Sequence, residues 1–295
     1  MPLPAITIAE SVLPASAARV PAAPGRLEYI EVESNVRLHV TDIGQGQPVL
    51  LLHGWPLSGD MYEYQFALLL AAGCRVISLT LRGFGRSDKP YGDYDYDVHA
   101  DDIKAVLLAL AVDNVTLGGY STGGAIAIRY MSRHAGAHVS KLALFSATAP
   151  SCIRRDDFPH SFFSMEDVQG LIDSLARNRP LALTQFAAGY TSPLPVELAA
   201  WLADLSMQAM PYASVQTLVA MGEADLRPEL ASIQVPVAIF HGRHDKINSF
   251  ALAEQLQLGL PHATLVVFEH SGHALFYEEL DKFNAELVQF VTSLA

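Results

Sequence analysis

The sequence predicts an α/β fold in which helices cover both faces of a mostly parallel sheet. Short runs that are wholly or mainly apolar recur along the chain, and segments whose apolar residues follow helical spacing separate them. The runs 48–52 and 115–118 each lead straight into a glycine-containing turn. With 295 residues, 51% of them hydrophobic, the chain has enough apolar material for one large domain of this class.

The elements of the first half follow in a regular order. Apolar and polar residues alternate over 27–33 and 36–42, which predicts two strands joined by a turn at Ser34-Asn35. The later apolar runs lack this alternation, so we expect strands that are buried on both faces. Those strands are expected at 48–52, 75–79, 115–118 and 141–146, and helices at 60–72, about 98–110 and 125–134.

The strand pattern disappears between 148 and 228. Apolar residues recur there at helical spacing and prolines interrupt them, which predicts a helical lid inserted into the α/β core. The core is therefore expected to comprise 26–147 and 229–295. Its second part contains two further apolar runs, 235–240 and 264–268, each followed by a helical pattern.

Residues 1–25 differ from the rest of the chain because they are rich in Ala and Pro. They lack the basic start and the unbroken apolar stretch of a signal peptide, so we expect a disordered N-terminal arm. No apolar run in the chain approaches the ~20 residues that span a bilayer. Together these features favour a cytoplasmic location.

Charge excludes two classes of partner. The formal net charge of −12 arises from 31 acidic against 19 basic residues. The chain therefore lacks the basic footprint of a nucleic-acid binder and the attraction to anionic membranes. The two cysteines, Cys74 and Cys152, do not make a disulfide framework. We expect a small-molecule partner, and the oligomeric state is not predicted.

Ser121 lies in the strongest motif, Gly119-Tyr120-Ser121-Thr122-Gly123. The motif follows an expected strand and precedes an expected helix, so Ser121 would lie on a sharp turn that exposes its hydroxyl. The turn is so tight that the positions two before and two after the serine must be small, and both are glycine. A Gly-rich turn alone would not explain this strand–helix context. The pattern predicts a nucleophilic serine.

A serine hydroxyl is a weak nucleophile that needs a base, and the base needs an acid to orient it. Asp245 follows the expected strand 235–240, and His273 follows 264–268. Both would reach the carboxyl edge of the sheet, where Ser121 also lies. The chain order serine, acid, histidine is the one expected for this arrangement. We predict a triad of Ser121, Asp245 and His273.

Other titratable residues compete for these roles. His244 and His270 are rival bases, but Gly272 favours a tight turn that presents the neighbouring His273. Asp225 is a rival acid, but it precedes the penultimate expected strand instead of following it.

Histidines at 241 and 244, and at 270 and 273, could also be read as pairs of metal ligands. Their i, i+3 spacing is weak evidence, because strong zinc signatures place histidines at i, i+4 on a helix or use paired cysteines. We therefore predict neither a metal nor a cofactor.

Two backbone N–H donors are needed to stabilise the oxyanion that develops in acyl transfer. Thr122 supplies one, directly after the nucleophile at a helix N-terminus. Trp55 is the expected second donor in the loop after strand 48–52, because Pro56 has no N–H. Apolar residues of this region and of the lid are expected to wall the substrate pocket, namely Pro56, Tyr120, Phe162 and Trp201. Core packing would explain most of the lid candidates equally well: Phe158, Phe162, Phe163, Leu171, Phe186, Trp201, Met207 and Met210.

These motifs together resemble the α/β-hydrolase superfamily, and within it the cofactor-free (non-haem) haloperoxidases and aryl esterases. The resemblance rests on the Ser121 motif and on His53-Gly54-Trp55-Pro56-Leu57, Arg82-Gly83-Phe84-Gly85-Arg86-Ser87 and Ser271-Gly272-His273. It implies an eight-stranded sheet with one antiparallel strand, and ester hydrolysis with perhydrolysis as a side reaction. Thr80 departs from the pattern, because many relatives carry Asp there. That position supports a loop, so the triad assignment stands.

We therefore expect a serine hydrolase that cleaves small apolar or aromatic carboxylic esters through an acyl-enzyme. A lactonase or a carbon–carbon bond hydrolase would use the same triad. A non-catalytic receptor for a small ligand could retain it as well. Dehalogenase and epoxide-hydrolase relatives use Asp at the nucleophile position, so Ser121 argues against both.

Overall fold

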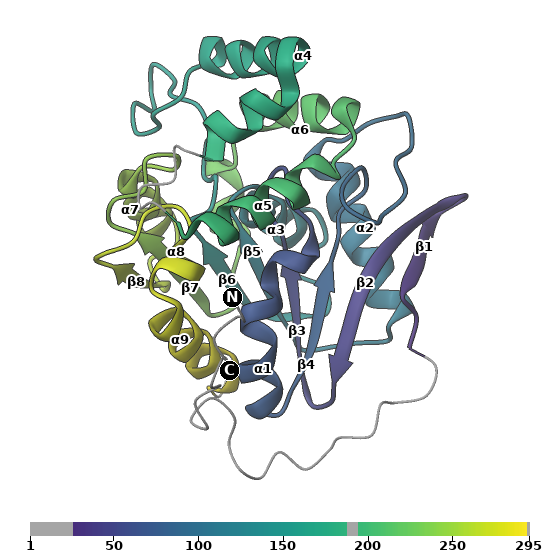
Figure 1. The fold of residues 1–295 in the computed structure, drawn as a ribbon. Helices are drawn as coiled ribbons and strands as arrows, with labels where there is room; N and C mark the ends of the chain where they lie inside the picture. The colour runs from purple at the N-terminus through teal and green to yellow at the C-terminus, as the bar shows by residue number, and fades with distance from the viewer. Residues whose placement is uncertain (1–25, 188–193, 294–295) are drawn as a thin grey trace, which may run out of the picture.

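A single eight-stranded sheet lies between two layers of helices in the computed structural model, which describes residues 26–187 and 194–293 (Figure 1). The expected N-terminal arm, residues 1–25, lies outside the described residues. The strands are β1 (Tyr29–Glu33), β2 (Val36–Gly44), β3 (Gln47–Leu52), β4 (Cys74–Leu79), β5 (Val115–Tyr120), β6 (Val139–Phe145), β7 (Val237–Gly242) and β8 (Thr264–Phe268). Their order across the sheet is β1-β2-β4-β3-β5-β6-β7-β8. Strand β2 runs antiparallel to its neighbours, and the pairs from β4 to β8 are parallel. The predicted mostly parallel sheet of an α/β-hydrolase fold is confirmed.

Helices follow most of the parallel strands. They are α1 (Glu63–Ala71), α2 (Tyr96–Ala109), α3 (Thr122–Arg133), α4 (Met165–Ala187), α5 (Val196–Met207), α6 (Pro211–Glu223), α7 (Phe250–Gly259), α8 (Leu275–Glu278) and α9 (Leu280–Thr292), with 3₁₀ turns η1 (Gly59–Tyr62) and η2 (Arg227–Ser232). None of these helices, within the ranges that the structure describes, is long and apolar enough to cross a bilayer.

Strand β3 shows how the sheet separates two hydrophobic cores. Its side chains point alternately to opposite faces, and both faces are buried. Leu50 and Leu52 pack into the core on the side of α2, α3 and α7. Val49 and Leu51 pack into the core on the side of α1 and α9. Burial on both faces is the reason that this run is apolar without alternation.

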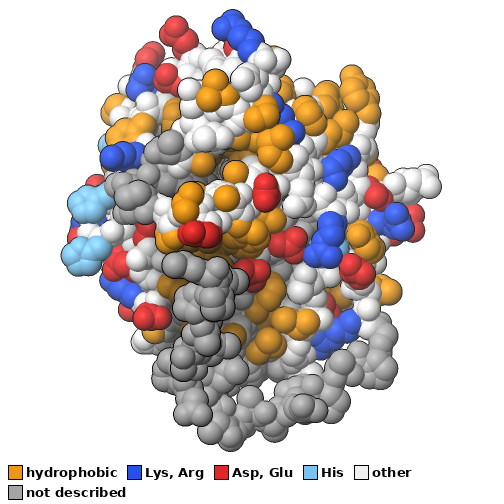
Figure 2. All heavy atoms as spheres, viewed as in Figure 1, with side chains coloured by type: hydrophobic (Ala, Val, Ile, Leu, Met, Phe, Trp, Pro, Cys, Tyr) orange, Lys and Arg blue, Asp and Glu red, His pale blue; other side chains and the backbone are white. Residues whose placement is uncertain are grey.

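Helices α4, α5 and α6 occupy the chain between β6 and β7 and lie over the upper end of the sheet in Figure 1. Helix α4 is kinked, because Asn178 has non-helical angles (φ −154°, ψ 81°) shortly before Pro180, whose ring cannot continue the helical hydrogen bonding. The space-filling view shows hydrophobic side chains on this part of the surface (Figure 2). Exposed apolar residues of this segment are Phe162, Met165, Leu181, Val196 and Met207.

Arg82 and Asp102 form a buried ion pair that fastens the loop after β4 to helix α2. The guanidinium donates two hydrogen bonds to the carboxylate, at 2.7 and 2.6 Å, and each side chain is less than a tenth exposed. Two residues before Arg82, the Thr80 hydroxyl accepts the N–H of Gly59 at 3.1 Å. Both contacts stiffen the loop behind the carboxyl end of β4, which is next to β3.

We predict that Asp102→Asn lowers the free energy of unfolding by about 3–5 kcal/mol, because it leaves the buried Arg82 charge without its main partner. Equilibrium urea unfolding measures the change. The matched control is Asp101→Asn, the adjacent residue, whose pair with Arg133 is half-exposed. That change should cost less than about 1 kcal/mol. Equal effects of the two variants would contradict the prediction.

Candidate active site

The backbone at Ser121 is forced into an unusual conformation between β5 and α3. Ser121 has φ 51° and ψ −118°, an angle pair that side-chain-bearing residues rarely adopt. A Cβ on Gly119 would lie 2.3 Å from the carbonyl oxygen of Gly123. A Cβ on Gly123 would lie 2.5 Å from that of Leu52. The turn therefore requires both glycines, and it directs the Ser121 hydroxyl to the carboxyl edge of the sheet.

The structure brings Ser121, His273 and Asp245 into one hydrogen-bonded line. Nδ1 of His273 lies 2.8 Å from Oδ2 of Asp245, and Nε2 lies 3.2 Å from Oγ of Ser121. All three side chains are buried. Because an ionised carboxylate only accepts, Nδ1 carries the proton and Nε2 is left to accept the Ser121 hydroxyl.

Asp245 is held as a carboxylate by its surroundings. Burial alone would raise its pKa, but the charge and hydrogen bond of His273 and the N–H of Asn248 keep the pKa below its ordinary value. Its second oxygen accepts the N–H groups of Ile247 and Asn248, at 2.8 and 2.9 Å. The carboxylate therefore orients the imidazole without taking its proton.

The competing residues lie elsewhere. His244 and His270 are exposed, and the N–H of His270 donates to Glu279. Asp225 pairs with Arg227 at 2.6 Å. His241 is buried and its Nε2 lies 2.8 Å from the carbonyl oxygen of Asn248. Because a carbonyl only accepts, this nitrogen donates and holds the loop that carries Asp245.

Two neighbours fix the position of the His273 ring. The Tyr120 ring lies against it with a centroid distance of 4.9 Å. The turn before His273 is hydrogen-bonded to the C-terminal end of helix α8. The N–H of Gly272 donates to Glu278 at 2.7 Å, and the Ser271 hydroxyl donates to Glu279 at 2.6 Å. A histidine held from two sides loses little freedom when it acts as a base.

The loop after β3 places Trp55 beside Ser121. A Cβ on the adjacent Gly54 would lie 3.0 Å from Cβ of Ser121, so the loop passes close to the serine. The Trp55 indole N–H donates to the carbonyl of Ser214 in α6 at 3.0 Å, and its ring packs edge-on against Phe186 at 5.0 Å. Within residues 26–187 and 194–293, the backbone N–H of Trp55 makes no hydrogen bond. Thr122 is the first residue of α3, where a backbone N–H has no acceptor within the helix.

His53 holds this loop from behind. Its Nε2 lies 3.0 Å from the N–H of Leu81 and its Nδ1 lies 2.9 Å from the carbonyl of Gly54. An N–H only donates and a carbonyl only accepts, so the neutral ring with its proton on Nδ1 satisfies both bonds. Burial lowers the pKa of His53 to about 4.

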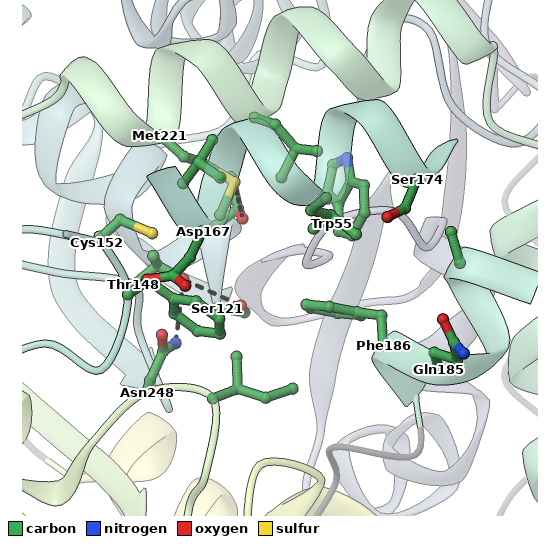
Figure 3. A pocket seen from close by; sticks show the side chains of 17 residues that line it. Trp55, Ser121, Thr148, Cys152, Asp167, Ser174, Gln185, Phe186, Met221 and Asn248 are labelled. Carbon is green, nitrogen blue, oxygen red and sulfur yellow. Dashed lines mark hydrogen bonds between the residues drawn. The ribbon is translucent and has the colours of Figure 1, made fainter. Parts of the chain in front are cut away.

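A cavity of about 270 Å³ opens above Ser121 (Figure 3). Its wall is mostly apolar and is supplied largely by the segment between β6 and β7: Phe163, Val168, Leu171, Ala182, Phe186, Leu218 and Met221, together with Trp55 and Ile247. Exposed polar residues on α4 form its rim, namely Asp167, Ser174 and Gln185. Cys152 also lines it, and burial raises the pKa of this thiol to about 12, so it stays protonated at neutral pH. The cavity suits an apolar group held against Ser121.

Four residues expected in the pocket wall do not line this cavity. Phe162 is 51% exposed, whereas its neighbour Phe163 points into the cavity. Trp201 on α5 packs against the rings of Tyr64 and Tyr277, beyond the cavity. Tyr120 is buried beneath His273, and Pro56 is buried in its turn. Sequence spacing did not distinguish the two faces of the inserted helices. Phe163, Leu171 and Phe186, which were expected as candidates, do contribute to the wall.

Two polar residues that the motifs did not indicate lie beside Ser121. Thr148 follows β6 and its Oγ1 lies 3.1 Å from Oγ of Ser121. Asn248 follows β7 and its Nδ2 lies 3.1 Å from Oγ1 of Thr148. Both line the cavity, and the dashed lines of Figure 3 join the three residues. The rule that sites form at the carboxyl ends of parallel strands would have found them, because each lies a few residues beyond such an end.

Comparison with known proteins places the chain in a family. Residues 47–280 match the family model described as the alpha/beta hydrolase fold. The chain belongs to the α/β-hydrolase family. It is 45% identical over 269 residues to the AB hydrolase superfamily protein YisY of Bacillus subtilis, covering 90% of this chain and 99% of that protein. It is 32% identical to a non-heme chloroperoxidase of Streptomyces lividans, over 84% of this chain and 92% of that protein. An esterase from Exiguobacterium antarcticum has a similar structure, with a TM-score of 0.88 and 39% identity, covering 90% of this chain and 99% of the other. The resemblance to the haloperoxidase and esterase branch is confirmed, and the protein is a hydrolase of this superfamily.

We predict that His53 makes this hydrolase sensitive to acid. The unfolded chain binds a proton at His53 near its ordinary pKa of 6.5, but the folded protein does so only near 4. Stability present above pH 6.5 is therefore lost as the pH falls towards 4, by about 3 kcal/mol for this group. Urea unfolding measures the free energy of unfolding at pH 7 and at pH 4. The decrease between the two pH values should be about 3 kcal/mol smaller in His53→Gln than in the wild type.

A second variant tests the same effect if His53→Gln does not fold. His99 is buried, and burial with the charge of Arg82 lowers its pKa to about 3. His99→Phe should therefore reduce the acid loss, the decrease in unfolding free energy between pH 7 and pH 4, by a similar amount. His270→Gln, at an exposed histidine, is the control and should leave the loss unchanged. An acid loss that is the same in all three variants would contradict the prediction.

Proposed function

We propose that this hydrolase cleaves carboxylic esters of small apolar or aromatic substrates, with Ser121 as the nucleophile. The observation that carries the proposal is the hydrogen-bonded line from Asp245 through His273 to Ser121, which ends at the floor of an apolar cavity. The arrangement supplies a nucleophile, a base and an orienting acid at one point. The esterase similarity of the fold supports the same class of reaction.

The proposed mechanism is acyl transfer in two halves. Nε2 of His273 takes the proton of Ser121 as Oγ attacks the ester carbonyl. The oxyanion accepts the backbone N–H groups of Trp55 and Thr122, and His273 then gives its proton to the leaving alcohol. In the second half, water loses a proton to His273, attacks the acyl carbon and releases the acid. Asp245 keeps the imidazole in the required tautomer throughout.

The cavity wall favours uncharged substrates. Among the described residues that line it, Asp167 is the only one that carries a charge at neutral pH, and it lies at the exposed rim. A charged group drawn into the apolar interior would lose hydration without gaining a partner. We propose that the segment 148–228, with its helices α4–α6, acts as the lid over this cavity. Lactones are internal esters and fit the same chemistry.

The proposal predicts that Ser121→Ala lowers kcat for p-nitrophenyl esters by about 10⁶, because the attacking oxygen is removed. Asp245→Asn should lower kcat by about 10⁴, because an amide no longer selects the tautomer that accepts the serine proton. A panel of p-nitrophenyl esters with short to long acyl chains, and of lactones, measures both. Ser232→Ala, at an exposed serine on η2, is the matched control and should match the wild type.

The same panel separates the competing functions. Repeated turnover that Ser121→Ala abolishes supports the esterase, and preferential turnover of lactones would identify a lactonase. Release of a single equivalent of nitrophenol by the wild type, without turnover, would favour a ligand receptor built on this fold. Wild-type activity in Ser121→Ala would overturn the proposal.

The cavity wall predicts a second result. Leu171→Trp adds volume inside the cavity, so the longest acyl chain that the enzyme accepts should become shorter while short esters are still hydrolysed. The kcat/KM profile across the acyl series measures the change. Leu181→Trp, at a half-exposed position of the same helix outside the cavity, should leave the profile unchanged. An unaltered profile in Leu171→Trp would show that the acyl chain binds elsewhere.

A further inference from the structure

Thr148 makes a third polar contact with the proposed nucleophile. Its hydroxyl oxygen lies 3.1 Å from Oγ of Ser121, and its backbone N–H donates to the carbonyl of Ser121 at 3.0 Å. The side chain is 3% exposed and lines the cavity. The hydroxyl is therefore held beside the atom that forms and breaks the acyl bond.

The direction of this hydrogen bond follows from its two ends. On one side, Asp245 fixes the proton of His273 on Nδ1, so Nε2 accepts and the single hydrogen of the Ser121 hydroxyl is donated to it. Ser121 has no second hydrogen to give. Towards Thr148, its oxygen can only accept.

Asn248 gives the same direction from the other side. One atom of its side-chain amide lies 2.7 Å from the carbonyl oxygen of Ser146 and 3.1 Å from Oγ1 of Thr148. Because a carbonyl only accepts, that atom must be the nitrogen, with its two hydrogens. Thr148 therefore accepts from Asn248, and its own hydrogen is free to point at Ser121.

We propose that Thr148, oriented by Asn248, is a further catalytic residue that donates a hydrogen bond to Oγ of Ser121 and accelerates breakdown of the acyl-enzyme. The proposal rests on the esterase function proposed above. It assigns the two polar residues at the cavity floor to one step of the reaction, the departure of the serine oxygen.

The hydrogen bond from Thr148 to Ser121 strengthens most in the second half of the reaction, the hydrolysis of the acyl-enzyme. In the acyl-enzyme, Oγ is the alkoxy oxygen of an ester and a poor acceptor. Water attacks the acyl carbon as His273 takes its proton, and the tetrahedral intermediate then collapses: the bond from carbon to Oγ breaks, and Oγ takes the proton from Nε2 of His273. Thr148 keeps its own proton. Negative charge grows on Oγ as the bond breaks, so the donated hydrogen bond is stronger in this transition state than in the acyl-enzyme.

The hydrogen bond from Thr148 accelerates acylation less, because the same bond already exists in the resting enzyme. The serine oxygen also gains negative charge as it attacks, but it starts as a hydroxyl that already accepts this hydrogen bond, so only the increase in the strength of the bond lowers the acylation barrier. The proposal therefore predicts that the two halves of the reaction respond differently to loss of the Thr148 hydroxyl, whereas a residue that only held the loop in place would affect both.

The test is Thr148→Val, which removes the hydroxyl at similar volume. Stopped-flow release of nitrophenol from a p-nitrophenyl ester gives acylation from the burst and deacylation from the steady state. We expect acylation to change by less than about threefold and deacylation to slow by about tenfold to a hundredfold. Intact-protein mass spectrometry during turnover should show the acyl-enzyme accumulating. Thr148→Ser should restore the deacylation rate.

Controls separate this proposal from the proposed function. Thr116→Val removes the hydroxyl of another buried threonine, on β5, which has no hydrogen-bond partner among the described residues, and should match the wild type. If Ser121→Ala is inactive but Thr148→Val deacylates at the wild-type rate, or if both halves slow equally, the role of Thr148 is overturned while the esterase stands. If Ser121→Ala keeps full activity, the esterase proposal itself fails.

Discussion

The close approach of backbone to backbone at the turn from β5 into α3 is the constraint on which the rest of the site depends. Gly119 and Gly123 let two carbonyls pass where any Cβ would collide, and this allows Ser121 its positive φ. The turn sets the position of the hydroxyl, of the N–H at the start of α3, which has no acceptor within that helix, and of the loop after β3, whose backbone passes beside Gly123. His273 and Asp245 come from distant parts of the sequence, but the parallel pairing of β5 to β8 brings their strand ends to the same edge.

Much of this arrangement could be predicted from the sequence, because local rules are strict where the backbone is strained or buried on two sides. The continuous apolar run 48–52 marked β3 and mainly apolar runs marked the other parallel strands, since β3 and β5, for example, contact a core on each face. The residues proposed as a triad could be selected because each follows an expected strand. Helix α3 begins at Thr122, three residues earlier than expected, because the turn at Ser121 is itself the start of the helix.

The cavity wall could not be predicted to the same degree. Which of two adjacent phenylalanines, Phe162 or Phe163, faces inward depends on how the inserted segment packs, and apolar spacing permits either. The pairing of Thr148 with Asn248 joins residues 100 positions apart and carries no local motif. Packing and long-range polar contacts thus decide the selectivity of the site, while the turn decides its chemistry.

The hydrogen bond from the Trp55 indole to the carbonyl of Ser214 has a consequence for how material enters and leaves. It joins the loop beside the serine to helix α6. A movement of α6 away from the sheet would therefore break this hydrogen bond or displace the loop. Helix α4 carries the exposed polar residues at the rim of the cavity, and its helical backbone is interrupted at Asn178. Helix α6 is thus tied to the loop beside the serine, whereas the rim of the cavity belongs to the interrupted helix α4.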